Sequence, residues 1–123
     1  MSKIVTAINS MISNSELITD VIKGTYDSEY FFKYSKKHNW SIFKAKDDNY
    51  ILNYYPGNPN LNDLAGLPDE AWEDHGPQLV NYSTKTLGTK EAIDSFRELH
   101  SIVSEKAYGM DDVLNDIIGN DLL

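Results

Sequence analysis

Residues 27–56 read DSEYFFKYSKKHNWSIFKAKDDNYILNYYP and carry most of the aromatic mass of the chain. With Tyr26 they hold ten of the fourteen aromatic residues, so we expect the core to form around them. Three short runs rich in Tyr, Phe, Trp and Ile are separated by two polar clusters, residues 36–39 and 46–49, whose lengths suit hairpin loops. The pattern predicts a three-stranded antiparallel meander.

Side-chain alternation along these strands assigns their faces. Lys33 and Asn53 are poor core residues, so their neighbours should point into the core: Tyr30, Phe32, Tyr34, Tyr50, Leu52 and Tyr54. The middle strand is ambiguous, because its aromatic and aliphatic residues fall on both faces. The second face is expected to be partly bare and to carry Phe31, Phe43, Ile51 and Tyr55. Such a surface suits an interaction, including a homodimer through the uncovered sheet face.

The segment before the meander has helical spacing. Ile4, Ile8, Met11 and Ile12 recur at helical intervals, and a second apolar set at residues 17–22 continues the pattern after a polar break. Ser13 and Glu16 have the spacing of a capping box, and Gly24 suits a left-handed helix end. We expect one kinked helix or two short ones here.

The segment after the meander is a long connection, followed by a strand and two helices. Residues 56–77 contain all four prolines and five acids, which predicts a long acidic loop. A fourth strand is expected over residues 78–87. A helix should begin after Thr89 and end at Gly109. A short amphipathic helix in the tail, residues 110–123, should dock on the domain or present its apolar side to a partner.

The predicted fold is a single α+β domain over residues 1–123. It combines a four-stranded antiparallel sheet, made of the three-stranded meander plus one strand, with N- and C-terminal helices packed mainly on one face. A chain of this length can bury a stable core without disulfides or bound metal ions. The absence of cysteine excludes disulfides and thiolate metal sites. The N-terminus is too polar for a signal peptide and no stretch approaches a membrane span, so we expect a cytoplasmic protein without membrane contact.

Charge favours a protein partner over nucleic acid. The net charge is −8, and no Lys or Arg occurs from Asp47 to Thr84, where seven acids lie. This acidic surface repels phosphates and attracts a basic protein. The alternative interpretation is that the acidity serves only to keep the protein in solution.

Catalytic motifs are missing from the sequence. There is no G-x-S-x-G, no G-x-G-x-x-G and no Walker A sequence, and the three histidines lie far apart. We therefore expect no catalytic residue, no metal and no cofactor. An enzyme or metal protein using the cluster from Asp69 to His75 is the second alternative.

Two binding surfaces are predicted. The leading hypothesis is a small acidic module that binds or neutralises a basic protein through Trp72, an interface anchor with an acidic rim of Asp69, Glu70, Glu73 and Asp74. The first alternative is a small-molecule pocket lined by Tyr30, Tyr34, Tyr50, Tyr54 and Tyr82.

The size, the acidity, the lack of cysteine and the α+β order together resemble the profile of bacterial immunity proteins and other small inhibitors. This likeness covers the whole chain and is one of composition, without a shared motif. It implies neutralisation of a protein partner.

Overall fold

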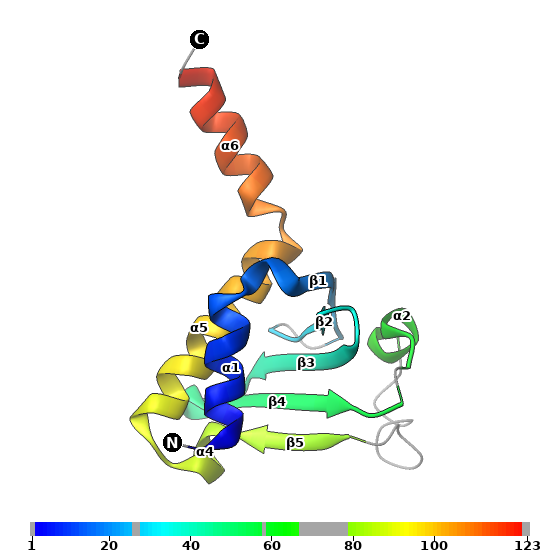
Figure 1. Cartoon of the computed structure of the whole chain (residues 1–123), viewed down its shortest axis with the longest axis vertical. Coiled ribbons are helices and arrows are strands. Elements are labelled where there is room, and N and C mark those ends of the chain that lie inside the picture. Colours follow the sequence, from blue (N-terminus) through cyan, green and yellow to red (C-terminus); the bar gives the residue numbers. More distant parts are fainter. Residues whose placement is uncertain (1, 26–27, 58, 67–78, 122–123) are drawn as a thin grey trace.

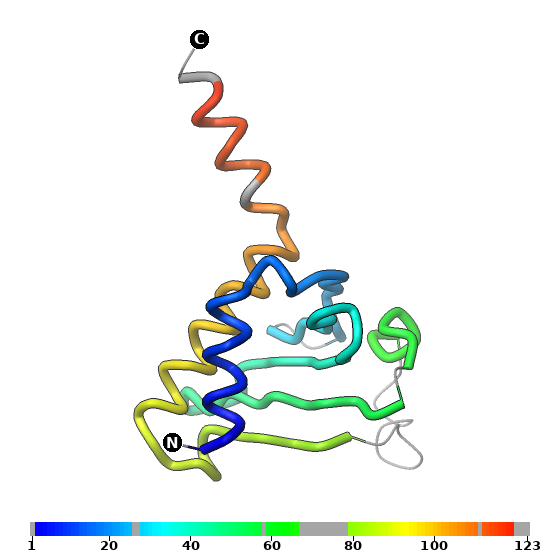
Figure 2. The backbone as a smooth tube through the Cα atoms, viewed as in Figure 1, coloured from blue at the N-terminus to red at the C-terminus, as the bar shows by residue number. Residues whose placement is uncertain are grey.

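The computed structural model describes residues 2–25, 28–57, 59–66 and 79–121, with only the backbone at positions 111, 120 and 121. Figure 1 shows one sheet, helices beside it and a C-terminal helix that projects away from the rest; Figure 2 traces the backbone. The elements follow in the order α1 (Lys3–Ser13), η1 (Ser15–Leu17), β1 (Ile18–Lys23), β2 (Tyr30–Tyr34), β3 (His38–Lys44), η2 (Lys46–Asp48), β4 (Tyr50–Tyr55), α2 (Leu61–Ala65), β5 (Val80–Ser83), α4 (Thr84–Leu87), α5 (Lys90–Ala107) and α6 (Met110–Asp121).

The five strands form one antiparallel sheet in the order β1-β2-β3-β4-β5. The register places Trp40 of β3 between Phe32 of β2 and Tyr54 of β4. It also aligns Ile42 with Tyr30, which assigns the middle strand its face. The prediction of an α+β fold with an antiparallel sheet is confirmed, whereas the prediction of four strands is wrong.

The additional strand is β1, where the sequence predicts helix. Helix α1 does end at the polar break. Asn14 caps it, and the Asn14 side-chain amide donates to the Ser10 carbonyl oxygen at 2.9 Å. The β-branched residues that follow favour a strand. Gly24 ends this strand, and a Cβ at this position would collide with the Glu29 side chain. A close approach of the backbone, not a helix cap, therefore requires this glycine.

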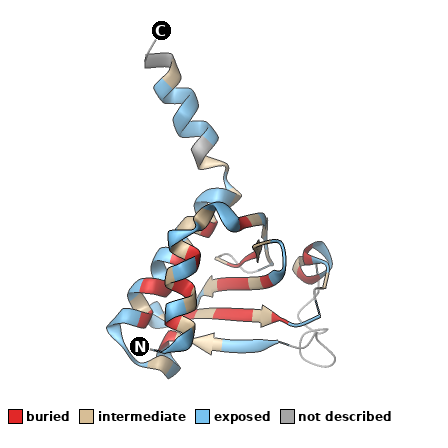
Figure 3. Ribbon diagram, viewed as in Figure 1, coloured by how far each residue is buried: buried red, intermediate tan, exposed pale blue. Residues whose placement is uncertain are grey.

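The larger buried cluster combines one face of the sheet with α1 and α5. Its members are Ile8, Met11, Ile18, Tyr30, Phe32, Ile42, Tyr50, Leu52, Phe96, Leu99 and Val103. Of the predicted inward residues of the first and third strands, Tyr30, Phe32, Tyr50 and Leu52 lie in this cluster and Tyr34 packs against it, whereas Tyr54 lines the groove described below. Figure 3 shows the buried positions concentrated where the helices meet the strands.

The second face of the sheet is not bare around Phe31 and Tyr55. Both side chains are buried, because Leu61 and Leu64 of α2 pack over them. The amide of Asn39, also on this face, donates to the Pro59 carbonyl oxygen. The expectation of an open aromatic patch is therefore wrong for these two residues, and the surface once assigned to a homodimer is smaller than predicted.

The chain after β5 turns into a helix earlier than the sequence suggests. Ser83 caps the short helix α4 and accepts a hydrogen bond from the Thr86 amide, so Thr84 and Thr86 are helical and not part of the strand. Gly88 adopts a positive φ of 69° and ends this turn. Thr89 then caps α5, as predicted, with its hydroxyl oxygen 3.1 Å from the Ala92 amide nitrogen.

Candidate functional site

A groove opens on the helix-facing side of the sheet, beside α1. Its volume is about 510 Å³. It is lined by Ala7, Ser10 and Met11 of α1 and by Tyr34, His38, Trp40, Tyr54, Val80 and Tyr82 of the sheet. All the sheet residues except His38 are aromatic or aliphatic. The groove is thus an apolar surface between α1 and the sheet.

The aromatic rings of the groove are held against one another. The Trp40 and Tyr54 rings meet edge to face, with centroids 4.9 Å apart and planes at 61°. His38 Nδ1 lies 3.2 Å from the Tyr54 hydroxyl oxygen, in a hydrogen bond. Such aromatic pairs prefer this geometry, so the wall is ordered before any ligand arrives.

One polar atom in this wall lacks a partner. Trp40 Nε1 is buried and makes no hydrogen bond with any described residue. An indole N–H is a donor only, and leaving it unpaired in a buried position costs about 1–3 kcal/mol. This nitrogen is closed to solvent, so it lies behind the open surface of the groove.

The edge of the groove carries positive charge within an acidic chain. Tyr34 and His38 both line the groove, and Ser35, Lys36 and Lys37 form the turn between them. The Lys37 amide donates to the Tyr34 carbonyl oxygen at 3.2 Å, which fixes this turn. Neither the groove lining nor α1 contains an acidic residue. The groove is therefore apolar with a basic edge.

The five tyrosines predicted to line one pocket divide into two groups. Tyr34, Tyr54 and Tyr82 line the groove. Tyr30 and Tyr50 are buried further along the same face, where each ring centroid lies 5.7 Å from that of His100. Burial raises the pKa of Tyr30, and a hydrogen bond with Tyr108 raises it further. The tyrosine-lined side is thus part core and part groove.

His100 has a structural environment. Its Nε2 donates to the Ser28 carbonyl oxygen at 2.8 Å, and its ring lies between the two buried tyrosines. This hydrogen bond joins α5 to the segment before β2.

Helix α6 is the second surface that stands open. Its aliphatic residues Val113, Leu114, Ile117 and Ile118 recur on one side of the helix, and their exposed fractions run from 44% to 56%. Figures 1 and 3 show α6 projecting beyond α5, with exposed colouring over most of its length. Of the two expected arrangements, docking on the domain and presentation of the apolar side, the structure has the apolar side of α6 uncovered.

The direction of α6 is set by a two-residue connection. Tyr108 ends α5, and Gly109 follows with a φ of 63°, a conformation that costs glycine little. The Gly109 carbonyl oxygen accepts from the amides of Asp112 and Val113 at 3.1 and 3.2 Å, so it starts the first turn of α6. The Gly109 amide in turn donates to the Lys106 carbonyl oxygen at 3.1 Å, which joins the connection to the end of α5.

The predicted acidic anchor lies outside the described residues. This applies to Asp69, Glu70, Trp72, Glu73 and Asp74, and also to His75 of the alternative metal cluster. Across the described ranges, no three His, Asp or Glu side chains come close enough together to hold a metal ion.

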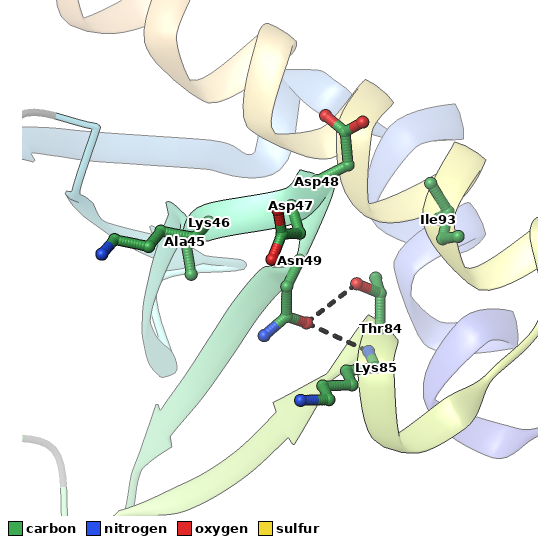
Figure 4. Close-up of a pocket in the computed structure, with 8 residues that line it drawn as sticks. All are labelled: Ala45, Lys46, Asp47, Asp48, Asn49, Thr84, Lys85 and Ile93. Atoms are coloured by element: carbon green, nitrogen blue, oxygen red, sulfur yellow. Dashed lines mark hydrogen bonds between the residues drawn. The ribbon is translucent and has the colours of Figure 1, made fainter.

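A second cavity of about 550 Å³ lies where the turn before β4 meets the start of α4. Figure 4 shows Asn49 at its centre, with its Oδ1 accepting from the Thr84 hydroxyl at 3.1 Å and from the Lys85 amide at 3.0 Å. Both acceptor positions of this oxygen are thus used to join the turn to the helix. The cavity has the contacts of a structural junction.

A buried polar cluster occupies the second face of the sheet. The hydroxyls of Ser41 and Tyr55 are 2.7 Å apart, and Asn81 donates to Asn53 Oδ1 at 2.7 Å. Burial raises the pKa of Tyr55 to about 12; the Ser41 hydrogen bond opposes this rise and the charge of Glu29 adds to it. Tyr55 therefore remains protonated at neutral pH, as a structural group.

Sequence reasoning missed most of the groove. The sequence predicts Tyr34, Tyr54 and Tyr82 on a ligand-binding side. It does not link them to Met11 of α1, since that contact depends on where the helix crosses the sheet. Val80 was expected in a strand and not in a binding wall. The alternation of His38 with Trp40 was the one local signal that would have placed both on the same side.

Comparison of the chain with protein-family models, curated proteins and solved structures finds no match in any of the three. Among the described residues, no helix has both the length and the apolar character needed to cross a membrane.

Proposed function

We propose that this chain is a small acidic protein-binding module that binds or neutralises a basic protein partner. The observation that carries the proposal is α6, an amphipathic helix whose four aliphatic side chains lie exposed beyond the domain. An amphipathic helix with an uncovered apolar side is a common recognition element for a groove in another protein. We also propose that the N- and C-terminal helices other than α6 pack mainly on one face of the sheet.

The charge of α6 supports a basic partner. The helix contains four aspartates and no Lys or Arg, within a chain of net charge −8. A partner groove with basic residues at its edge would receive the aliphatic side and pair with the aspartates. The acidic residues around Trp72 would add a second contact and speed association, and a cytoplasmic location remains a prediction.

Capture from the native cell lysate at low salt tests this function. The baits are the wild type, Ile117→Asp, and the matched control Asn115→Asp, which adds the same charge on another side of α6. We expect a basic protein to bind the wild type and the control and to be lost with Ile117→Asp. Trp72→Ala tests the loop in the same experiment. Identical captures by all baits, or captures of acidic proteins alone, would overturn the proposal.

The groove supports a second candidate function, the binding of a small apolar ligand. The observation that favours it is the open aromatic wall formed by Trp40, Tyr54 and Tyr82. A ligand with an apolar body suits this wall. A thermal-shift screen of such compounds should find ligands that raise the Tm of the wild type and not of Val80→Lys. If no compound does so, or if the variant responds equally, the candidate fails.

A further inference from the structure

Helix α6 and the groove complement each other in the same chain. We propose that α6 of one chain lies in the groove of a second copy, which returns the same contact. The groove has an open aromatic wall and a volume of about 510 Å³. The aliphatic side of α6 supplies four exposed side chains, those of Val113, Leu114, Ile117 and Ile118. This is the helix-in-groove mode of recognition, in which side chains from successive turns of a helix fill one apolar surface.

The charges of the two surfaces also match. The side chains of Asp112 and Asp116 on α6 are exposed, and no basic residue lies on that helix. The groove edge carries Lys36 and Lys37, both exposed, beside His38. The chain as a whole is strongly acidic, so a basic edge at the apolar groove is a local exception. Lys36 shares a small hollow with Glu16, so the attraction of an acidic helix rests mainly on Lys37.

The direction of α6 favours a second copy over the same chain. The groove lies beside α1 near Ala7 and Met11, whereas α6 starts near Ser15 and Ile102 and runs away from the sheet (Figure 1). Folding back into its own groove would require the Gly109 connection and its hydrogen bonds to be rebuilt. A second copy receives the helix as it stands.

Reciprocal exchange gives a closed pair. Each chain offers one helix and accepts one helix, so a two-fold axis satisfies both surfaces at once. The two contacts together double the buried area of a single inserted helix, and stable interfaces bury about 1,200 Å² or more in total. Both apolar surfaces then leave water in a single step.

The exchange also gives the protein a state in which α6 is covered. This part of the inference rests on the proposed function. A basic partner that binds α6 must take the helix from the groove of the second copy. The dimer thereby holds both surfaces covered until a stronger partner is present, and its dissociation sets the concentration at which α6 becomes accessible.

Sedimentation of the purified full chain at several concentrations tests the exchange without any partner. We expect a monomer–dimer equilibrium whose Kd rises about tenfold or more with Ile117→Asp and with Val80→Lys, and changes little with Asn115→Asp. Circular dichroism of each variant confirms that the domain remains folded. A wild type that is monomeric at every concentration, or a dimer that all variants retain, would overturn the exchange.

Cysteine cross-linking identifies the contact, because the natural chain has no cysteine. Val80→Cys mixed with Ile117→Cys should give a mixed disulfide dimer under mild oxidation, several-fold faster than Val80→Cys mixed with Asn115→Cys. Equal rates for both mixtures contradict the exchange. In the double variant Val80→Cys/Ile117→Cys, a monomer with an internal disulfide would also overturn it, since α6 would then occupy its own groove.

These experiments separate the exchange from the proposed function. The purified chain can fail to dimerise while its α6 still captures a basic protein from the lysate. Conversely, a dimer with the predicted cross-link can form although no partner is captured, which would leave the exchange standing and remove the proposed function.

Discussion

The two ends of one sheet face differ in what covers them. At one end, Ile42 and Leu52 are fully buried in a cluster with Phe96 and Leu99 of α5. At the other end of the same face, the sheet residues of the groove remain at least partly exposed, and Val80 of β5 is 43% exposed. The side chains at both ends are apolar. Their different burial follows from where the helices end, not from residue type.

This difference separates stability from binding. The covered end holds the apolar contacts that stabilise the fold, while the open end and α6 carry apolar surface that contributes little to the isolated chain. Surface of this kind is expected where a protein meets a partner. Substitutions in the two regions should therefore affect different measurements.

The covered end gives the largest expected effect on stability. Phe96→Ala removes a fully buried ring and leaves a cavity among Phe32, Leu52 and their neighbours. We expect the free energy of unfolding to fall by about 3–5 kcal/mol. Urea denaturation measures this loss. A loss below about 1 kcal/mol would break the comparison, because the covered end would then not hold the fold.

The second face supplies a pH-dependent test of a covered group. The pKa of Tyr55 is raised to about 12 in the folded protein, above the usual value of 10, so folding favours its protonated form. The stability from this group is complete below pH 10 and is lost as the pH rises through 12. We expect the free energy of unfolding to fall by about 2–3 kcal/mol over this range in the wild type. This pH-dependent fall should be absent in Tyr55→Phe.

Denaturation of the wild type and Tyr55→Phe at pH 8 and over pH 10–12 checks the effect of Tyr55. At pH 8 the difference between the two reports the lost contact with Ser41. Parallel pH profiles above pH 10 would show that Tyr55 is not the group that titrates.

The open end gives a smaller effect on stability. Trp40 is only half-buried and its main aromatic contact is Tyr54, so Trp40→Ala should lower the free energy of unfolding by about 1–2 kcal/mol. The same urea experiment measures it beside Phe96→Ala. Equal losses for the two variants would mean that the groove belongs to the core.

Helix α6 gives the smallest effect. Ile117→Ala should change the free energy of unfolding of the dilute chain by less than about 0.5 kcal/mol, because Ile117 is 54% exposed and lies on the projecting helix. Leu99→Ala, which removes a buried aliphatic side chain from α5, is the contrasting variant and should cost about 2–5 kcal/mol. A comparable loss in both variants would place α6 in the core.

Local pattern predicted the elements whose faces are fixed by their own residues. Alternation identified Tyr30, Phe32, Leu52 and their neighbours as inward, and the capping position of Thr89 identified the start of α5. These features depend on residues close together in the chain. They could therefore be found without the structure.

Features set by distant contacts could not be predicted. The apolar spacing at residues 17–22 fits a helix as well as a strand, and pairing with β2 decides for the strand. The division of the tyrosines between core and groove depends on how far α1 and α5 extend over the sheet. The projection of α6 depends on Gly109, which was recognised only as a helix end. The anchor predicted at Trp72 lies outside the described residues and remains a prediction.

Hydrogen exchange of the α6 amides over a range of protein concentrations tests the central claim, that this helix is free of its own domain and available to another surface. In dilute solution, α6 should exchange far faster than α5, because a short helix without packing is only marginally stable. Its protection should rise as the concentration rises or when the captured partner is added, while α5 changes little. Protection of α6 equal to that of α5 at every dilution would contradict the account, since the helix would then be packed on its own chain.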